Sequence, residues 1–375
     1  MVRGLARRIA EEKVLPVRAQ LDESEEFPWD IVRELAASDM FRVFVPEKYG
    51  GLGGGSLDLC LAVEELSRIC SGVAITYAAV ALGSIPIIEH GTDAQKERYL
   101  PDIAAGKRLT AFALTESAAG SDVAAIRTQA VKEEDGYVIN GAKQFITNGG
   151  EAEIYTIIAI TDRSKGIRGA TAFVVEKDTP GFNFGKKEKK MGIRASSTRE
   201  LVFRNCKVPK ENLLGAEGQG FIITMRTLNR SRPGVAAQAL GLAQGALEAA
   251  VGYARQREQF GHPISAIQAV QHMLADMATQ VEAARSLLYA TCRTIDSGAK
   301  DFTEESAMVK VFASDVAMRV TTDAAQIFGG AGYMRDYPAE KMMRDAKITQ
   351  IYEGTNQVLR NQVALELLKR KGRRP

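Results

Sequence analysis

One carboxylate near the end of the chain stands in a setting that suits a functional side chain. Glu353 lies between Tyr352 and Gly354 in the sequence IYEGTNQ. Apolar, helix-compatible segments precede it and follow it at 358–368, so helices can fix its backbone while its side chain faces a cleft. Gly354 permits backbone conformations that other residues resist, including the close approach of a ligand. An arbitrary Glu is more often solvated at a helix start or in a loop. Whether Glu353 is functional therefore depends on the other motifs in the chain.

Two further segments combine small residues with polar groups. Residues 114–122, LTESAAGSD, offer hydroxyls and amides that can cradle a phosphate or the edge of a flavin. A simple Asx or Ser turn is the alternative there. Residues 326–333, QIFGGAGY, place three glycines in a strongly helical region, where glycine lowers helix stability. That pattern indicates either a tight connection between helices or the close approach of a cofactor.

The composition is that of a globular protein with room for two or three domains. The chain has 375 residues, of which 45% are hydrophobic and 25% charged. Its net charge of +3 is too close to neutral to indicate nucleic acid or an acidic membrane as the main partner. The basic end, 369–374, is expected to be a solvated tail.

Cysteine usage and the first residues indicate the compartment. The cysteines form no CxxC pair and the chain has three His, which argues against a zinc site or a disulfide framework. Residues 1–16 read as an amphipathic helix, because no apolar stretch follows the basic residues as in a signal peptide. No apolar run is expected to be long enough to cross a bilayer. We therefore expect a cytoplasmic protein without a membrane span.

The first block, residues 1–110, is predicted to be an N-terminal helical domain. The glycine-rich run 45–55 lacks the GxGxxG register and a strand–helix setting, so it is interpreted as a loop between helices. Residues 59–69 resume a helix. Residues 73–88 are nearly all apolar or small, which suits a buried helix that could wall a ligand cavity, although core packing explains most of them.

The middle block, residues 111–215, is predicted to be a β domain resembling a barrel or sandwich. Asn140-Gly141, between 137–139 and 143–147, is a strong signal for a two-residue hairpin. The charged run 186–190 is expected to be a solvated turn. Further β-rich segments are 154–160, 170–175 and 200–203.

The last block, residues 216–375, is predicted to be a C-terminal four-helix bundle. Apolar residues step by three and four through 267–288 and 309–327, and the Ala-rich stretch 235–254 lets neighbouring helices approach closely. The predicted fold class is therefore α+β and mostly α, with helices, then β, then helices.

These segments together resemble the acyl-CoA dehydrogenase family of FAD-dependent flavoproteins. ALTESAAGSDVAA has the first signature pattern of that family, and residues 326–345 have the second. RQREQFGHPISAIQAVQ and DAKITQIYEGTNQ also fall at the family's spacing. The resemblance covers essentially the whole chain.

The resemblance implies an oxidoreductase that converts an acyl-CoA to its trans-2-enoyl-CoA, as in fatty-acid β-oxidation. Glu353 would remove the α-proton, while the β-hydrogen leaves as hydride to FAD. Electrons would pass to an electron-transfer flavoprotein. Some family members carry the base on the bundle helix instead, at the position of Ser231 here. A hydroxyl cannot replace a carboxylate, which strengthens the assignment of Glu353.

The resemblance also assigns cofactor contacts. Phe145 stands where family members usually have Trp beside the isoalloxazine, and it can stack but lacks the indole donor. The implied contacts within one subunit are Phe112, Leu114, Thr115, Gly120, Ser121, Phe145 and Thr147, with Thr355 and Gln357 near the adenosine end. The residues implied to reach the FAD of a neighbouring subunit are Arg257, Phe260, Gln268, Gln326 and Gly330. A shared FAD implies a homo-oligomer, by family habit a homotetramer.

On the substrate side the resemblance matches Arg232 and Ser121 to the CoA, and Tyr352 to the acyl pocket. Ala78, Ala79 and Leu82 are where a cavity floor could lie. Residues 72–86 contain no Arg or Lys, which argues against a free distal carboxylate on the substrate. A short, medium, branched or alicyclic acyl group remains open, because one methylene is worth only about 1–3 kcal/mol in such a pocket.

Other functions fit the same scaffold. An acyl-CoA oxidase, or an enoyl-CoA reductase working in the opposite direction, would share the site. A nucleic-acid-associated relative would need a strongly basic face, and a purely structural role fits poorly with Glu353 and the glycine-bearing segments.

Overall fold

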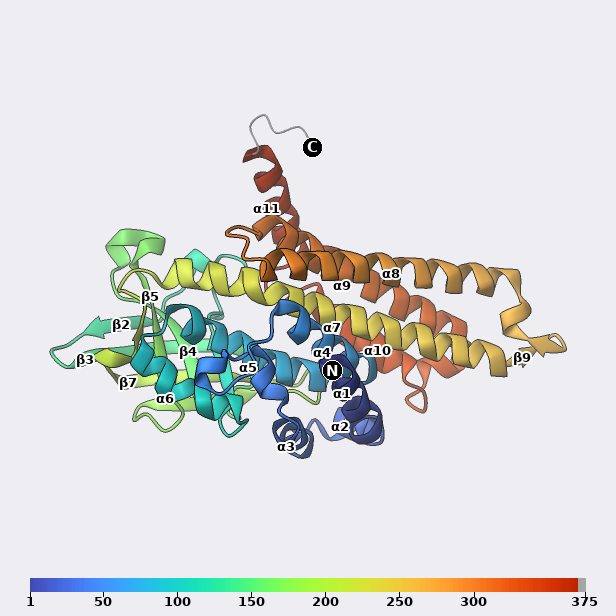
Figure 1. The fold of residues 1–375 in the computed structure, drawn as a ribbon, viewed down its shortest axis with the longest axis horizontal. Helices are drawn as coiled ribbons and strands as arrows, with labels where there is room; N and C mark the ends of the chain where they lie inside the picture. Colours follow the sequence, from blue (N-terminus) through green and yellow to red (C-terminus); the bar gives the residue numbers. More distant parts are fainter. Residues whose placement is uncertain (370–375) are drawn as a thin grey trace.

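The computed structural model describes residues 1–369. Helices, then a sheet, then helices follow one another along the chain, as Figure 1 shows. The predicted fold class is confirmed. The expected solvated tail begins at Lys369, and residues 370–374 of it lie outside the described residues.

The first block is helical and surrounds the apolar helix α5. Its glycine-rich run forms a loop, as expected, between the 3-10 turn Glu47–Tyr49 and α4. A capping box begins α6, because the Gln95 amide donates to Thr92 Oγ1 at 3.2 Å and the Thr92 amide donates to Gln95 Oε1 at 2.8 Å. The helices are α1 (Val2–Ile9), α2 (Arg18–Ser24), α3 (Trp29–Ala37), α4 (Ser56–Ile69), α5 (Ser71–His90) and α6 (Asp93–Ala104).

Helix α5 corrects one expectation. It has 20 residues, most of them apolar, so by length and composition alone it could cross a membrane. The apolar segment is thus longer than the sequence suggested, because helical structure continues beyond 73–88 at both ends. Most of its apolar residues are buried, against α4, the later helix α7 (Gly220–Gln256) and the strand β1 (Thr110–Ala113). The burial is that of a core helix. No other helix within residues 1–369 is long and apolar enough to cross a membrane.

The middle block forms one eight-stranded sheet. The strand order is β6-β7-β3-β2-β4-β5-β8, and β1 pairs parallel with β4. Every residue of β4 is buried, which explains its continuous apolar sequence. The strands are β1 (Thr110–Ala113), β2 (Gln129–Lys132), β3 (Gly136–Thr147), β4 (Ile154–Ile160), β5 (Ala170–Glu176), β6 (Phe182–Lys187), β7 (Thr198–Pro209) and β8 (Leu213–Leu214).

The predicted hairpin at Asn140-Gly141 is wrong. Both residues lie inside the continuous strand β3, which pairs with β7 on either side of a bulge at this point. The Asn205 amide donates to Asn140 Oδ1 at 2.7 Å, and Gly141 has a φ of +145°. A Cβ on Gly141 would come within 2.7 Å of Thr128 Cα, so the glycine serves the bulge rather than a turn.

The predicted solvated turn at 186–190 is also wrong in part. Lys186 and Lys187 belong to β6, and Lys187 Nζ donates to the Glu25 carbonyl at 2.8 Å. Lys190 Nζ donates to the Ser196 carbonyl at 2.6 Å. These lysines tie the sheet to neighbouring segments.

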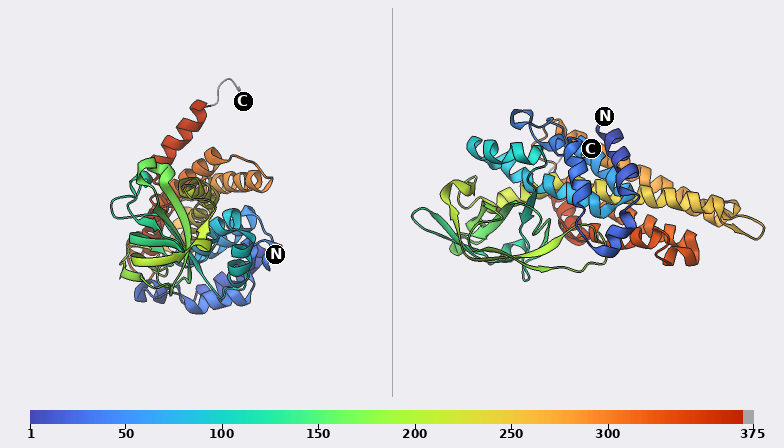
Figure 2. Two further views of the ribbon diagram at one scale, coloured as in Figure 1. Left: turned by 90° about the vertical axis from the view of Figure 1, so that its left-hand side faces the viewer. Right: turned by 90° about the horizontal axis from the view of Figure 1, so that it is seen from below.

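The last block is built on the 37-residue helix α7, which packs against α4, α5, α8 and α9. It runs from the sheet to the far end of the bundle, where β9 (Glu258–Gln259) and β10 (His262–Pro263) form a small hairpin (Figures 1 and 2). Helix α11 projects from the body in both figures. The helices are α7 (Gly220–Gln256), α8 (Gln268–Asp296), α9 (Thr303–Phe328), α10 (Ala339–Thr349) and α11 (Asn356–Lys369).

Candidate active site

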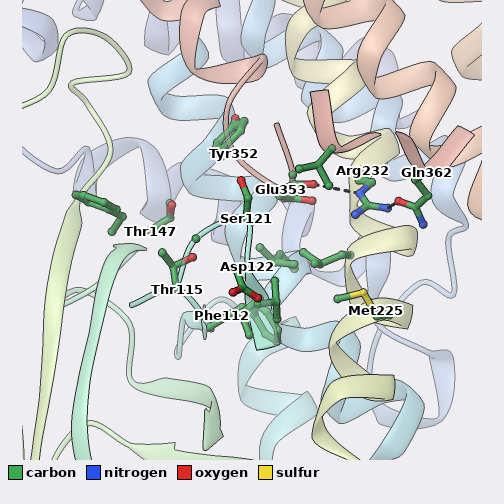
Figure 3. Close-up of a pocket in the computed structure, with 18 of the residues that line it drawn as sticks. Phe112, Thr115, Ser121, Asp122, Thr147, Met225, Arg232, Tyr352, Glu353 and Gln362 are labelled. Carbon is green, nitrogen blue, oxygen red and sulfur yellow. Dashed lines mark hydrogen bonds between the residues drawn. The ribbon is translucent and has the colours of Figure 1, made fainter. Parts of the chain in front are cut away.

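A cavity of about 640 Å³ lies where all three blocks meet. Its walls come from α5, the loop after β1, the end of β3, α7, the segment that joins α10 to α11, and α11 itself (Figure 3). The predicted site residues that line it are Ala78, Ala79, Leu82, Phe112, Leu114, Thr115, Gly120, Ser121, Phe145, Thr147, Arg232, Tyr352 and Glu353. Segments far apart in sequence therefore converge on one space.

Glu353 sits in a strained backbone. Its φ is +51° and that of Gly354 is +97°, so two successive residues adopt left-handed conformations. Such a conformation costs of order 1–3 kcal/mol for a residue with a side chain and persists only where its surroundings impose it. Here Ser231 Oγ donates to the Glu353 carboxylate, and Arg232 Nε donates to the Glu353 carbonyl at 3.1 Å.

Burial raises the pKa of the Glu353 carboxyl above its ordinary value. The Ser231 hydrogen bond and the charges of Arg232 and Lys310 oppose that rise. The carboxyl is thus held in a mostly apolar cavity, with two cationic side chains nearby that favour its ionised form. A carboxylate in such surroundings is suited to act as a general base.

Arg232 connects three elements around Glu353. It lies on α7 and is 4% exposed. One guanidinium nitrogen donates to Asn229 Oδ1 at 2.7 Å and to Gln362 Oε1 of α11 at 3.0 Å (Figure 3). Burial lowers its pKa to about 10, while the Glu353 charge opposes that change. Arg232 therefore remains a cation at neutral pH and fixes α11 against α7.

Tyr352 is held on the opposite side of the loop. Its hydroxyl donates to Gln238 Oε1 of α7, and Gln238 Nε2 donates to Ser71 Oγ at 2.8 Å. Burial raises the pKa of the phenol well above its ordinary value, so it stays a neutral donor. These contacts fix the ring at the cavity wall.

The loop at 114–122 is anchored by a buried ion pair that the sequence did not reveal. Lys143 Nζ of β3 donates to Glu116 Oε1 at 2.7 Å and to the Leu114 carbonyl at 3.0 Å. Glu116 also accepts from the amides of Arg127 and Thr128, at 2.6 and 3.0 Å. Burial lowers the pKa of Lys143 to about 8. The two partners lie 27 positions apart, so their charges alone gave no signal of pairing.

The cavity offers features that fit a planar, partly polar cofactor. Phe145 has a φ of +60° and leaves 57% of its surface exposed, although it lines the cavity. A Cβ at Gly120 would find no atom within 4 Å, so the loop leaves open space there. The hydroxyls of Thr115, Ser121 and Thr147 lie among the same walls. An aromatic face next to hydroxyl donors suits the flavin that the resemblance implies.

Other predicted site residues do not reach this cavity. They lie where α7 and α9 end and α8 begins, at the end of the bundle that carries the β9–β10 hairpin. Gln268 and Gln326 belong to α8 and α9, Arg257 directly follows α7, Phe260 lies in the hairpin, and Gly330 lies in the 3-10 turn Gly329–Tyr333. There Tyr253 of α7 stacks on Phe328 of α9 with ring centroids 4.2 Å apart.

Thr355 and Gln357 flank the start of α11, outside the set of cavity-lining residues. Thr355 Oγ1 accepts from the Val358 amide at 3.3 Å and so caps that helix.

The structure also adds residues to the site. Phe221, Met225 and Leu228 line the cavity from α7, and Ile75 lines it from α5. The spacing of the three α7 residues, four positions and then three, was an available signal. Asp122 and Gln362 also line it, and neither carried a distinguishing pattern.

Comparison with known families gives a consistent result over the whole chain. Family models for acyl-CoA dehydrogenase match in order: the N-terminal domain at residues 1–107, the middle domain at 111–206 and the C-terminal domain at 218–368. The chain is 52% identical over 360 residues to the short-chain-specific acyl-CoA dehydrogenase of Megasphaera elsdenii, covering 94% of each. It is 46% identical to the acryloyl-CoA reductase (NADH) of Anaerotignum propionicum, over 99% of this chain and 94% of the relative.

Solved structures also match this chain over nearly its whole length. The butyryl-CoA dehydrogenase of Megasphaera elsdenii superposes with a TM-score of 0.96 at 50% identity, covering 98% of this chain and 97% of that one. A chain in the structure of the electron transferring flavoprotein of Acidaminococcus fermentans, studied for flavin-based electron bifurcation, gives 0.97 at 51% identity, with the same coverage.

Proposed function

The chain belongs to the acyl-CoA dehydrogenase family, FAD-dependent oxidoreductases of the CH–CH bond of acyl-CoA, and we propose that it dehydrogenates a short-chain acyl-CoA with Glu353 as catalytic base. The observation that carries this proposal is a half-buried carboxylate in a strained loop at the wall of the cavity between α5, the β domain and α7.

Glu353 removes the α-proton of the thioester. An α-C–H is a weak acid, so the base gains from a raised pKa and from exclusion of water, which burial provides. Ser231 and Arg232 hold the carboxylate and its backbone in place. The bound FAD supplies the hydride acceptor for the β-carbon. The backbone amide of Glu353 serves as a donor to the thioester oxygen, where negative charge develops.

Residues of two subunits would hold the FAD. Thr115, Ser121 and Thr147 supply hydroxyls, Phe145 supplies an aromatic face, and the loop at Gly120 leaves room for the cofactor. Phe112 and Leu114 complete that wall, with Thr355 and Gln357 toward the adenosine end. Arg257, Phe260, Gln268, Gln326 and Gly330 reach the cofactor of a neighbouring subunit in a homotetramer, since within one chain they lie far from the cavity.

The acyl chain lies against α5, where Ala78, Ala79 and Leu82 line the cavity with Tyr352. The absence of Arg and Lys from 72–86 argues against a distal carboxylate. Arg232 and Ser121 lie on the CoA side. The names of the short-chain-specific acyl-CoA dehydrogenase and of the butyryl-CoA dehydrogenase structure, both of Megasphaera elsdenii, support a short straight acyl group over a branched or alicyclic one.

Electrons pass to an electron-transfer flavoprotein in the cytoplasm. A similar chain in a structure of such a flavoprotein supports this choice. The opposite direction, reduction of an enoyl-CoA, is the second candidate, favoured by the likeness to an acryloyl-CoA reductase. Anaerobic NADH oxidation with acryloyl-CoA, in the presence of the flavoprotein, separates the two directions.

The test is a panel of acyl-CoAs of graded length, branching and ring content, scored by flavin bleaching with an artificial acceptor. We expect butyryl-CoA or a neighbour of similar length to give the highest kcat/KM. Glu353→Gln should keep the yellow flavin and lose at least about 10³-fold in turnover, the order of a lost general base. An active, FAD-replete Glu353→Gln enzyme would refute the proposal.

A further inference from the structure

A buried lysine lies beneath the Glu353 loop. Lys310 is on α9, and its side chain is completely buried. Its Nζ donates to the Gly354 carbonyl at 2.9 Å and to Asn356 Oδ1 at 3.0 Å. A buried ammonium without a direct carboxylate partner is costly, so the fold retains it against a considerable penalty.

Lys310 is part of a polar cradle that α9 presents to this loop. Asn356 Nδ2 donates to Ser314 Oγ and to Asp315 Oδ1, both at 2.8 Å. Gln350 Nε2 donates to the same Asp315 oxygen at 2.6 Å. The loop is therefore fixed on both sides of Glu353, and Lys310 holds the carbonyl of the residue directly after it.

We propose that Lys310 is a positioning residue for the reaction, holding the left-handed Glu353-Gly354 backbone through the Gly354 carbonyl and, as a buried cation, favouring the ionised form of the carboxylate. The inference rests on the proposed role of Glu353. Three residues, Arg232, Ser231 and Lys310, then share the task of presenting one carboxylate.

The charges around Lys310 support the second part of this role. Glu353 of the loop and Asp315 of α9 favour the ammonium form, whereas Arg232 of α7 opposes it. Burial, the largest effect, lowers the pKa of Lys310 to about 7. The ammonium in turn lowers the pKa of Glu353. Removing the cation should therefore raise the pKa of Glu353, and the enzyme should need a higher pH to reach full activity.

Two variants separate the charge from the hydrogen bond. Lys310→Met removes both, while Lys310→Gln keeps an amide donor without charge. With butyryl-CoA, we expect Lys310→Met to lower kcat by about ten- to a hundredfold with little change in KM, the effect of losing a hydrogen bond to a charged group. In both variants the acid limb of the kcat/KM profile should move to higher pH. Lys310→Arg, which keeps the charge, should leave the limb near its wild-type position.

Arg319→Met is the matched control, because Arg319 lies on the same helix with 61% of its side chain exposed. It should leave both kcat and the acid limb unchanged. If the acid limb of the kcat/KM profile does not move in FAD-loaded Lys310→Met and Lys310→Gln, the inference is overturned, even if kcat falls. Failure of both variants to fold would overturn it too, in favour of a purely structural lysine.

Glu353→Gln, assayed in parallel, separates this inference from the proposed function. If Glu353→Gln keeps wild-type turnover, the proposed function fails. If Glu353→Gln is inactive while the acid limb of the kcat/KM profile of the Lys310 variants stays at its wild-type pH, only the inference about Lys310 fails.

Discussion

Two residues that line the cavity, Glu353 and Phe145, adopt left-handed backbone conformations with φ of +51° and +60°. Neither is a glycine, so each carries a conformational cost that the surrounding contacts must offset. For Glu353 those contacts are Ser231, Arg232 and the hydrogen bond from Lys310 to the next carbonyl. The strain places one carboxylate and one aromatic ring at the walls of the same space.

Ser231 gives a prediction at this scale. Its hydroxyl donates to the Glu353 carboxylate and so lowers the pKa of that group. A base must be ionised to work, and ionisation is lost as the pH falls through its pKa. In Ser231→Ala the acid limb of kcat/KM should therefore move up by about one pH unit, the size of a hydrogen bond to a charged group. The plateau at higher pH should stay close to the wild-type rate.

Ser231→Thr is the control, since it restores a hydroxyl at the same place and should restore the limb. If the acid limb of the kcat/KM profile does not move in Ser231→Ala, the Ser231 hydroxyl does not influence the ionisation of Glu353.

Glu353, Ser121 and Phe145 were named from dense local motifs and from the family resemblance. The structure places all three at the cavity, where their roles stay predictions. The contacts that support Glu353 could not be named in the same way. The contact of Ser231 with Glu353 spans 122 positions and that of Lys310 with Gly354 spans 44. A single sequence carries no pattern for such pairs, because each partner alone looks like an ordinary helix residue.

At the scale of elements, α7 and α4 approach so closely that only glycine fits between them. A Cβ on Gly241 of α7 would lie 2.1 Å from the Glu64 carbonyl oxygen of α4. Gly241→Ala should therefore force the helices apart and destabilise the protein by about 1–3 kcal/mol, the usual cost of overpacking. Thermal unfolding of the FAD-loaded enzyme measures the change.

Gly252→Ala on the same helix is the matched control. A Cβ there would meet no atom within 4 Å, so the higher helix propensity of Ala should stabilise by up to about 1 kcal/mol. If both substitutions have the same effect, close packing against α4 is not the reason for Gly241.

The wrong predictions at this scale share a cause. Asn140-Gly141 has the local chemistry of a hairpin, but β7 pairs with both halves of β3 and makes it a bulge. The length of α5 and the strand conformation at Lys186 likewise depend on neighbours that are distant in sequence. Helix and strand types followed from periodicity, whereas the partners of each element came only from the three-dimensional structure.

At the scale of the whole molecule, the cavity and the far end of the bundle are separate within one chain. Phe260 at that end is 89% exposed, and Gly329 and Gly330 leave open space around them. Residues of this kind on a single chain fit a surface that another copy covers. If a second copy completes the site, activity requires an unaltered cavity on one chain and an unaltered far end of the bundle on the other chain.

Complementation between variants tests that arrangement. Arg257→Glu places a negative charge where the phosphates of the partner's FAD are expected, so it should empty the partner's site. Glu353→Gln inactivates its own site. Within a mixed pair, the cavity of the Arg257→Glu chain keeps its base and receives an intact far end from the Glu353→Gln chain. Co-expressed with two tags and purified on both, the mixed enzyme should regain flavin bleaching by butyryl-CoA that neither variant shows alone.

The reciprocal mixture makes the test decisive. A chain carrying both substitutions, paired with wild type, should give no active site in the mixed pair. Its own cavity lacks the base, and the wild-type cavity receives the altered far end. If each chain instead completed its own site, the results would reverse: the first mixture would stay inactive, while in the second the wild-type chain would keep its activity. The two mixtures contain the same substitutions in equal numbers. A difference in activity between them therefore reports whether the FAD contacts come from one chain or from two.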